Sequence, residues 1–163
     1  MAELRVGTAF DAHRLVAGRP LVLGGVTIPH DRGLDGHSDA DIVCHALTDA
    51  ILGAAGAGDI GEMFSDQDPA NRGRDSIEML RAAVERVRAM GWMVHNADVT
   101  VVAEQPKIGP HREAMRASLA IALGVDARAV SVKGKTNEGM GWVGRAEGLA
   151  CMAVASLVPV TPR

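Results

Sequence analysis

The sequence predicts an α+β protein in which helices pack on one face of a single mixed β-sheet. The predicted segments follow the order βββ-α-α-β-α-β-β, so each long helix returns the chain to the sheet. A chain of 163 residues can bury roughly 70% of its extended surface in one core. No internal repeat or low-complexity linker interrupts the chain, so we expect one domain over residues 1–163.

The first half of the chain contains three predicted strands. Residues 4–11 are apolar enough for a strand, and residues 21–23 and 26–28 flank Gly24-Gly25. Because glycine adopts positive φ without strain, this pair favours a tight hairpin turn. Residues 29–36 are predicted to form a loop.

Three helices are expected at 3.6-residue periodicity. The first begins near Ser38, where Asp41 three residues later resembles a capping box, and carries an apolar stripe from Ile42 to Ala54. The second runs from residue 75 or 76 towards Gly91, and the third covers residues 111–123.

The remaining strands are expected over residues 92–103, 130–133 and 149–157. A glycine-rich segment, residues 134–148, separates the last two strands. Residues 64–73 form a polar loop with no predicted regular structure.

Composition excludes several classes of protein. A net charge of −3 argues against nucleic-acid binding, which requires a basic surface. No run reaches the roughly 18 apolar residues that cross a membrane, and the N-terminus lacks the apolar core of a secretion signal. We therefore expect a cytoplasmic protein, or one of the plastid stroma if the source is a plant. Cys44 and Cys151 are expected to be buried free thiols.

Asp11 and His13 are the first candidate metal ligands. Residues two apart on a strand face the same side, so the two side chains should project together. His45, on the first predicted helix, could complete an open three-ligand site of the kind that catalytic zinc uses. Alternatively, Asp11 and His13 are ordinary polar residues at a strand end, since spacing alone does not show that His45 approaches them.

Two segments could bind phosphate. His37-Ser38 at the start of a helix would offer side chains beside free backbone N–H groups, although Ser38 could equally be a simple cap. Residues 133–139 combine lysines, a hydroxyl and a carboxylate in a glycine-flanked turn. This turn lacks P-loop spacing, and a solvated loop is the alternative.

The turn-like segments 58–61 and 66–68 contain aspartates that are usually structural in such positions. Residues 106–110, with prolines at both ends, form a rigid loop that could present backbone groups to a planar ligand. Without further support, both are ordinary loops.

Taken together, these stretches resemble one family, 2-C-methyl-D-erythritol 2,4-cyclodiphosphate synthase of the non-mevalonate isoprenoid pathway. The matching pieces appear in order over nearly the whole chain: G-T-A-F-D-A-H-R-L, L-G-G-V-x-I-P, G-H-S-D-A-D-x-x-x-H-A-L-T-D-A, G-D-I-G, F-S-D-Q-D-P, A-E-Q-P-K and G-R-A-E-G-L-A-C. Ordered coverage of this extent is far more specific than any single motif.

The resemblance implies a reaction that turns 4-diphosphocytidyl-2-C-methyl-D-erythritol 2-phosphate into the cyclic diphosphate and CMP. It is an intramolecular phosphoryl transfer by a phosphorus–oxygen lyase, and no protein nucleophile is needed. By the same resemblance, Asp11, His13 and His45 bind Zn²⁺ or a similar ion. A second cation, Mg²⁺ or Mn²⁺, would bind with the substrate phosphates at Glu138.

The resemblance also assigns the remaining site residues. Catalytic contacts to the phosphates and second cation would come from His37, Ser38, Lys135, Thr136 and Glu138. Substrate-binding residues would be Asp59, Ile60, Gly61, Phe64, Asp66, Ala103, Lys107, Ile108, Gly109, Trp142 and Arg145. Two positions depart from the family: Lys135 replaces a common Thr, and Ala146 replaces a common Gly.

The family assembles as a homotrimer with active sites between subunits, so the resemblance implies the same here. It further implies an axial cavity at Arg145 that holds an isoprenoid diphosphate in some members. No fused cytidylyltransferase is expected on this chain. Two rival functions remain open: a metal-dependent phosphatase or nucleotide hydrolase on the same scaffold, and a non-catalytic metal- or isoprenoid-binding module.

Overall fold

A five-stranded mixed sheet organises the computed structural model, which describes residues 3–160. The strand order is β4-β1-β7-β5-β6, and only β5 and β6 are parallel. The strands are β1 (Arg5–Ala17), β4 (Arg32–Leu34), β5 (Trp92–Val102), β6 (Val130–Lys135) and β7 (Gly148–Pro159), with β2 (Leu21–Leu23) and β3 (Val26–Ile28) forming a separate hairpin. The helices are α1 (Ile42–Ala55), α2 (Ile60–Met63), α3 (Ser76–Ala89), α4 (Arg112–Leu123) and α5 (Gly141–Gly144), and three short 3₁₀ turns cover Pro69–Asn71, Gly109–His111 and Ala127–Ala129.

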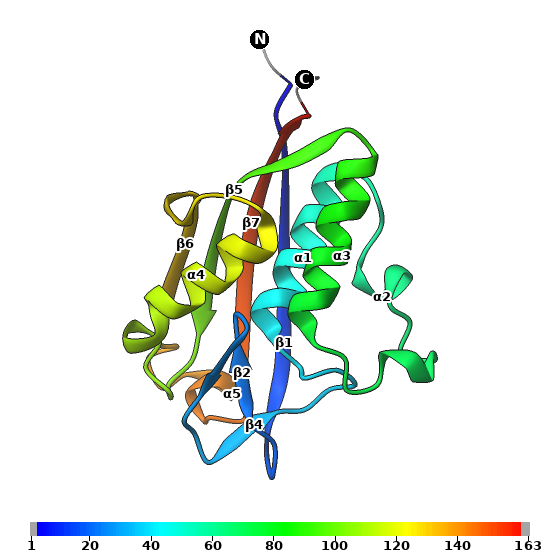
Figure 1. Ribbon diagram of the computed structural model, residues 1–163. Helices are drawn as coiled ribbons and strands as arrows, with labels where there is room; N and C mark the ends of the chain where they lie inside the picture. Colours follow the sequence, from blue (N-terminus) through cyan, green and yellow to red (C-terminus); the bar gives the residue numbers. More distant parts are fainter. Residues whose placement is uncertain (1–2, 161–163) are drawn as a thin grey trace.

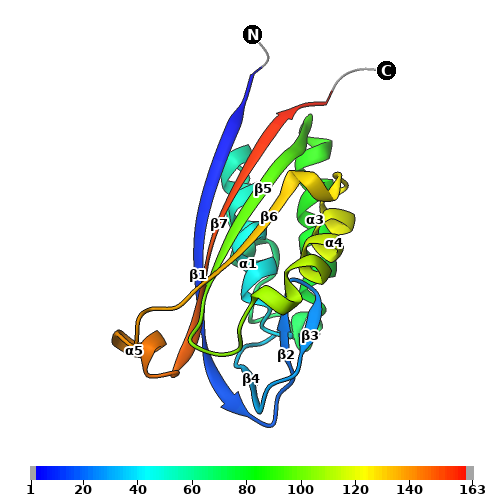
Figure 2. The ribbon, with the colours of Figure 1, turned by 90° about the vertical axis from the view of Figure 1, so that its left-hand side faces the viewer.

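The long helices α1, α3 and α4 lie on one face of the sheet, as predicted (Figure 1). Figure 2 shows the sheet nearly edge-on with these helices on one side and the β2–β3 hairpin closing the lower end of the helical layer. One buried apolar cluster runs through the sheet, these helices and the hairpin. The described residues contain no helix that is long and apolar enough to cross a membrane.

Several element boundaries differ from the predictions. β1 continues past Asp11 to Ala17 because it pairs antiparallel with β7 through His13 and then with β4. The predicted loop over residues 29–36 contains β4, since only the sheet edge gives Arg32–Leu34 a hydrogen-bonding partner. β6 likewise extends to Lys135. The ends of the predicted domain, residues 1–2 and 161–163, lie outside the described residues.

The predicted cap of α1 was wrong. The N-cap is Asp41, whose carboxylate accepts hydrogen bonds from the backbone N–H groups of Val43 and Cys44 at 3.0 and 3.2 Å. The same carboxylate also accepts from Gly24 and Gly25 in the hairpin turn, at 2.9 and 2.7 Å. Asp41 is fully buried, so it joins the hairpin to the start of α1 by tertiary contacts that local sequence does not encode.

Gly7 allows α1 to lie directly against β1. A Cβ at Gly7 would stand only 1.9 Å from the carbonyl oxygen of Ala50 and 2.6 Å from the amide nitrogen of Ala54. Both partners are helix backbone, so they cannot rotate away as a side chain could. Because α1 lies against the sheet and also packs against α3 and β2, it is buried almost all round rather than along one stripe, which corrects the amphipathic prediction.

The other face of the sheet is not covered by the long helices. Val6 and Phe10 on β1 are each 61% exposed, and Met152 and Val154 on β7 are 48% and 43% exposed. Phe10 pairs with Met152 in the β1–β7 ladder, so these apolar side chains form one surface. Contiguous exposed apolar surfaces are typical of interaction sites.

We expect Gly7→Ala to lower the free energy of unfolding by about 3 kcal/mol, because the added methyl group must push α1 away from β1. Urea denaturation measures this loss. Gly53→Ala is the matched control: it lies on the exposed side of α1, where an added Cβ meets nothing within 4 Å. The control should be neutral or stabilise by up to about 1 kcal/mol. Equal effects of the two substitutions would contradict the close-packing argument.

Candidate metal centre and substrate cavities

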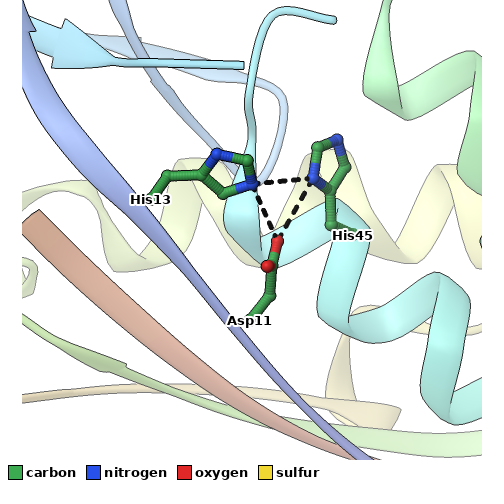
Figure 3. Close-up of side chains that lie close together, drawn as sticks. All are labelled: Asp11, His13 and His45. Atoms are coloured by element: carbon green, nitrogen blue, oxygen red, sulfur yellow. Dashed lines mark hydrogen bonds and ion pairs between the residues drawn. The ribbon is translucent and has the colours of Figure 1, made fainter. Parts of the chain in front are cut away.

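Asp11, His13 and His45 converge on one point (Figure 3). Asp11 and His13 project from the same side of β1, and His45 faces them from the first turn of α1. The His13 Nε2 atom is 3.1 Å from Asp11 Oδ2, and His45 Nδ1 lies 3.2 Å from that oxygen and 3.3 Å from His13 Nε2. The convergence that spacing alone could not establish is therefore present.

The dimensions of this cluster suit a small divalent cation. Nitrogen and oxygen ligands that hold zinc tetrahedrally at about 2.0–2.1 Å stand about 3.3 Å from one another. The three side chains are 12% to 26% exposed, so the cluster is sheltered yet reachable from solvent. Two imidazoles and one carboxylate would leave one coordination position for a ligand oxygen.

The ionised carboxylate of Asp11 also favours binding of a cation at the cluster. Burial disfavours ionised Asp11, but hydrogen bonds and Coulomb attraction from His13 and His45 outweigh it and hold the pKa of this carboxyl below its ordinary range. Burial opposes protonation of His13, yet its contacts with Asp11 and Asp35 raise the pKa of its imidazole overall. A proton and a metal ion therefore compete for His13.

The far nitrogen of His13 is also engaged. Its Nδ1 atom lies 2.5 Å from the backbone carbonyl oxygen of Asp35, which can only accept a hydrogen bond. Nδ1 therefore carries a proton, and in the neutral imidazole the Nε2 lone pair faces the cluster. Hydrogen bonding at the nitrogen remote from the metal is the usual way in which a histidine ligand is oriented.

A cavity of about 270 Å³ opens beside the cluster. It is lined by the three candidate ligands and by six further residues predicted for the substrate site: His37, Ser38, Ile60, Gly61, Phe64 and Asp66. Segments far apart in sequence therefore contribute to one cavity. Gly36, Asp49, Asn71 and Met79 also line it, and sequence reasoning gave them no role.

Asp49 supports the cavity wall. Its Oδ1 accepts a hydrogen bond from the Ile60 backbone N–H at 2.7 Å, which fixes the start of α2. Mainly through burial, its pKa is raised. The signal that could have identified Asp49 is its position four residues after His45 on the same helix face. Asp59 caps α2 through Glu62 N–H and is not among the cavity-lining residues.

Ser38 lies before α1 and not at its N-cap. The first N–H groups of that helix are bound by Asp41, so the predicted phosphate site on the helix N-terminus was wrong. Ser38 Oγ instead accepts from Ala40 N–H at 3.1 Å and lies 3.0 Å from His45 Nε2. Any phosphate at Ser38 would therefore meet side chains and not the helix terminus.

A second cavity of about 290 Å³ lies where β5 and β6 end. Six of the predicted residues line it: Ala103, Lys107, Ile108, Gly109, Lys135 and Thr136. Glu138 is adjacent, and its carboxylate accepts a hydrogen bond from Thr136 Oγ1 at 2.9 Å. The loop is held by Glu104, which sequence reasoning missed and whose Oε1 accepts from Asn137 and Gly139 N–H at 2.9 and 3.2 Å.

Trp142 and Arg145 do not line either of these cavities. Trp142 lines a separate hollow with His13, and Arg145 is exposed and paired with Glu147 at 2.7 Å. Ala146, where the family commonly has glycine, keeps the turn by adopting a φ of 54°. Left-handed backbone at alanine costs about 1–2 kcal/mol, so the departure is accommodated as local strain.

Comparison with known proteins identifies the family. The YgbB family matches residues 4–158. The chain belongs to the YgbB family. The 2-C-methyl-D-erythritol 2,4-cyclodiphosphate synthase of Gemmatimonas aurantiaca is 60% identical over 157 residues, covering 96% of this chain and 95% of the relative. The family resemblance inferred from the ordered motifs is thus confirmed.

Solved structures of family members share the fold. The bifunctional IspDF of Campylobacter jejuni superposes with a TM-score of 0.95 at 41% identity, covering 98% of this chain and 43% of that one. The IspF–CDP complex of Plasmodium falciparum gives a TM-score of 0.86 at 32% identity and covers 99% of each chain. Both identities are high enough for the likeness to extend beyond fold class.

The affinity of the cluster for zinc should fall as the pH is lowered. Because the pKa of His13 is raised above its ordinary value of 6.5, protons begin to compete with the metal above that pH. Asp11 stays ionised throughout this range. Chelator competition from pH 8 to pH 5.5 should show about a tenfold loss per pH unit for each proton displaced. A pH-independent affinity over this range would contradict the assignment of His13 as a ligand.

Proposed function

We propose that this chain is a 2-C-methyl-D-erythritol 2,4-cyclodiphosphate synthase. It converts 4-diphosphocytidyl-2-C-methyl-D-erythritol 2-phosphate to the cyclic diphosphate and CMP in non-mevalonate isoprenoid biosynthesis. The observation that carries the proposal is the convergence of Asp11, His13 and His45 beside a cavity lined by the family's own motifs.

In this reaction, an oxygen of the substrate's 2-phosphate forms a new bond to the β-phosphorus, and the bond between that phosphorus and the CMP oxygen breaks. Attacking and leaving groups belong to one molecule, so positioning and charge neutralisation supply the catalysis. Asp11, His13 and His45 would hold Zn²⁺ or a similar ion. That ion supplies Lewis-acid polarisation of a phosphate oxygen when bound.

The other residues of the first cavity would contact different parts of the substrate. His37 and Ser38 would donate hydrogen bonds to the substrate phosphates beside the metal cluster. Asp59, Ile60, Gly61, Phe64 and Asp66 would contact the methylerythritol portion from α2 and the loop after it. The P. falciparum relative is described as a complex with CDP, which supports a cytidine-binding role for the family motif retained here.

We assign the second cavity to the cytidine diphosphate half of the substrate. Ala103, Lys107, Ile108 and Gly109 would hold the base. Lys135 and Thr136 would contact phosphate, and Glu138 would bind Mg²⁺ or Mn²⁺ between the phosphates. Lys135, where the family commonly has threonine, would add a positive charge beside the substrate phosphates in this cavity.

The two cavities support an active site shared between subunits. One is built on β1, α1 and α2 and the other on the ends of β5 and β6, with β7 and β5 lying between β1 and β6 in the sheet. Three strand spacings separate β1 from β6 by about 14 Å. A homotrimer would bring the first cavity of one subunit beside the second cavity of its neighbour. The apolar sheet face at Phe10 and Met152 offers the surface such a trimer needs.

The proposal includes the synthase as one domain over residues 1–163, with a cytoplasmic location. It also includes Trp142 as a substrate contact and a ligand site for an isoprenoid diphosphate at Arg145 on the trimer axis. The exposed Arg145 guanidinium suits a diphosphate, although Glu147 already pairs with it.

Zinc analysis and CMP release test the reaction. The wild-type protein with Zn²⁺ and Mg²⁺ should convert the diphosphocytidyl substrate to CMP and the cyclic diphosphate, and His45→Ala or Asp11→Asn should lose at least about 100-fold in rate. Running the reaction in H₂¹⁸O separates the rivals, since a synthase incorporates no solvent oxygen and a hydrolase does. An open product that carries ¹⁸O would show that the protein is a hydrolase. A protein that binds zinc but does not turn over the substrate would be a non-catalytic binding module.

Mixing two inactive variants tests the shared site. His45→Ala disables the first cavity and Glu138→Ala disables the second. If each site combines cavities of adjacent subunits, co-refolded mixed trimers should regain about a quarter of the wild-type sites. Mixtures of His45→Ala with Asp11→Asn, both in the first cavity, should regain none. Absence of recovery in correctly assembled mixed trimers would place each site within one chain.

A further inference from the structure

Ser76 lies behind the metal cluster and has no role in the function proposed above. It is the first residue of α3, fully buried, and its Oγ lies 3.0 Å from His45 Nε2. Ser76 Oγ also donates a short hydrogen bond to the Asp39 carboxylate, and the Ser76 backbone N–H donates to the same carboxylate at 3.2 Å. Three segments of the chain therefore meet at the nitrogen of His45 that points away from the cluster.

The hydrogens in this network can be assigned by elimination. Ser76 has one hydroxyl hydrogen, and because a carboxylate oxygen can only accept, that hydrogen points to Asp39. Towards His45, Ser76 Oγ can then only accept. A hydrogen bond across the 3.0 Å contact between Ser76 and His45 therefore requires His45 Nε2 to be the donor, which leaves the Nδ1 lone pair facing Asp11 and His13.

We propose that Ser76, itself held by Asp39, is a positioning residue that fixes the ring of His45 for metal binding through Nδ1. The inference rests on the proposed metal-dependent function. It parallels the contact of His13 Nδ1 with the Asp35 carbonyl, so each histidine ligand is oriented by an acceptor on its remote nitrogen. Asp39 reaches His45 only through Ser76 and touches no candidate ligand directly among the described contacts.

The arrangement also determines what Ser38 can do. Ser38 Oγ lies 3.0 Å from His45 Nε2 and 3.2 Å from Ser76 Oγ. Because the Ser76 hydrogen points to Asp39, a hydrogen bond between the two serines requires Ser38 to be the donor. The single Ser38 hydroxyl hydrogen can therefore bind either Ser76 or an anion in the cavity that Ser38 lines, and not both at once. Ser76 Oγ is thus an acceptor within reach of both His45 and Ser38.

Metal affinity, measured without substrate, tests the inference. Zn²⁺ affinity by chelator competition should fall about 10- to 100-fold in Ser76→Ala, and Ser76→Thr, which keeps the hydroxyl, should recover most of it. Co²⁺ bound in place of zinc should show altered visible absorption in Ser76→Ala. Asp39→Ala should lower affinity by a similar factor, because the freed Ser76 hydrogen can then turn towards His45 Nε2.

Thr48→Val is the matched control. Thr48 lies on α1 one turn from His45, is fully buried, and its hydroxyl has no hydrogen-bond partner within the described part of the chain. Removing this hydroxyl should leave Zn²⁺ affinity unchanged. Circular dichroism and thermal unfolding establish that each variant is folded, and Asp39→Ala carries the test if Ser76→Ala is not.

Zinc binding by the wild type and by Asp11→Asn distinguishes failure of the metal site from failure of the positioning role of Ser76. If wild type binds zinc, Asp11→Asn does not, and Ser76→Ala binds as tightly as wild type, the positioning role is overturned while the metal site stands. If Asp11→Asn binds as tightly as wild type, the metal site itself fails, and the role of Ser76 fails with it. Equal losses in Thr48→Val and Ser76→Ala would also overturn the inference, since the effect would then not depend on the Ser76 contact.

Discussion

The candidate metal site depends on the close packing of helix α1 against strand β1. Gly7 removes the side chain that would hold the two backbones apart, and α1 lies against the strand at Ala50 and Ala54. The spacing between strand and helix sets the distance from Asp11 and His13 to His45. Ligand atoms must lie within a few tenths of an ångström of their required positions, so a helix displaced by one methyl group would separate the third ligand from the other two.

Asp41 controls the other end of the same helix. Its buried carboxyl group accepts from two N–H groups of α1, from two of the β2–β3 turn and from the Cys44 thiol. The helix terminus is thereby withdrawn from ligand binding. In the proposed function, the side chains of His37 and Ser38 would bind the anion, while Ser76 and Asp39 lie on the far side of His45. Asp41 thus uses the N-terminal N–H groups of α1 for a structural contact, next to the cavity.

The sheet divides the functional groups between two edges. The candidate metal ligands lie on β1 and α1, and the candidate phosphate and base contacts lie at the ends of β5 and β6. Under the proposed function a single chain would carry two incomplete sites, and the exposed apolar face lies on β1 and β7. In the proposed trimer, assembly would serve catalysis as well as stability, because a neighbouring copy would complete each site.

Local sequence determined the elements whose signals are short-ranged. Apolar periodicity identified the three long helices, Gly24-Gly25 identified the hairpin, and two-residue spacing put Asp11 and His13 on one face. Ordered motifs identified the family. Tertiary structure alone decided the cap at Asp41, the strand within residues 29–36 and the approach of His45. Each of these depends on partners distant in sequence, and their hydrogen bonds and packing outweigh local propensity.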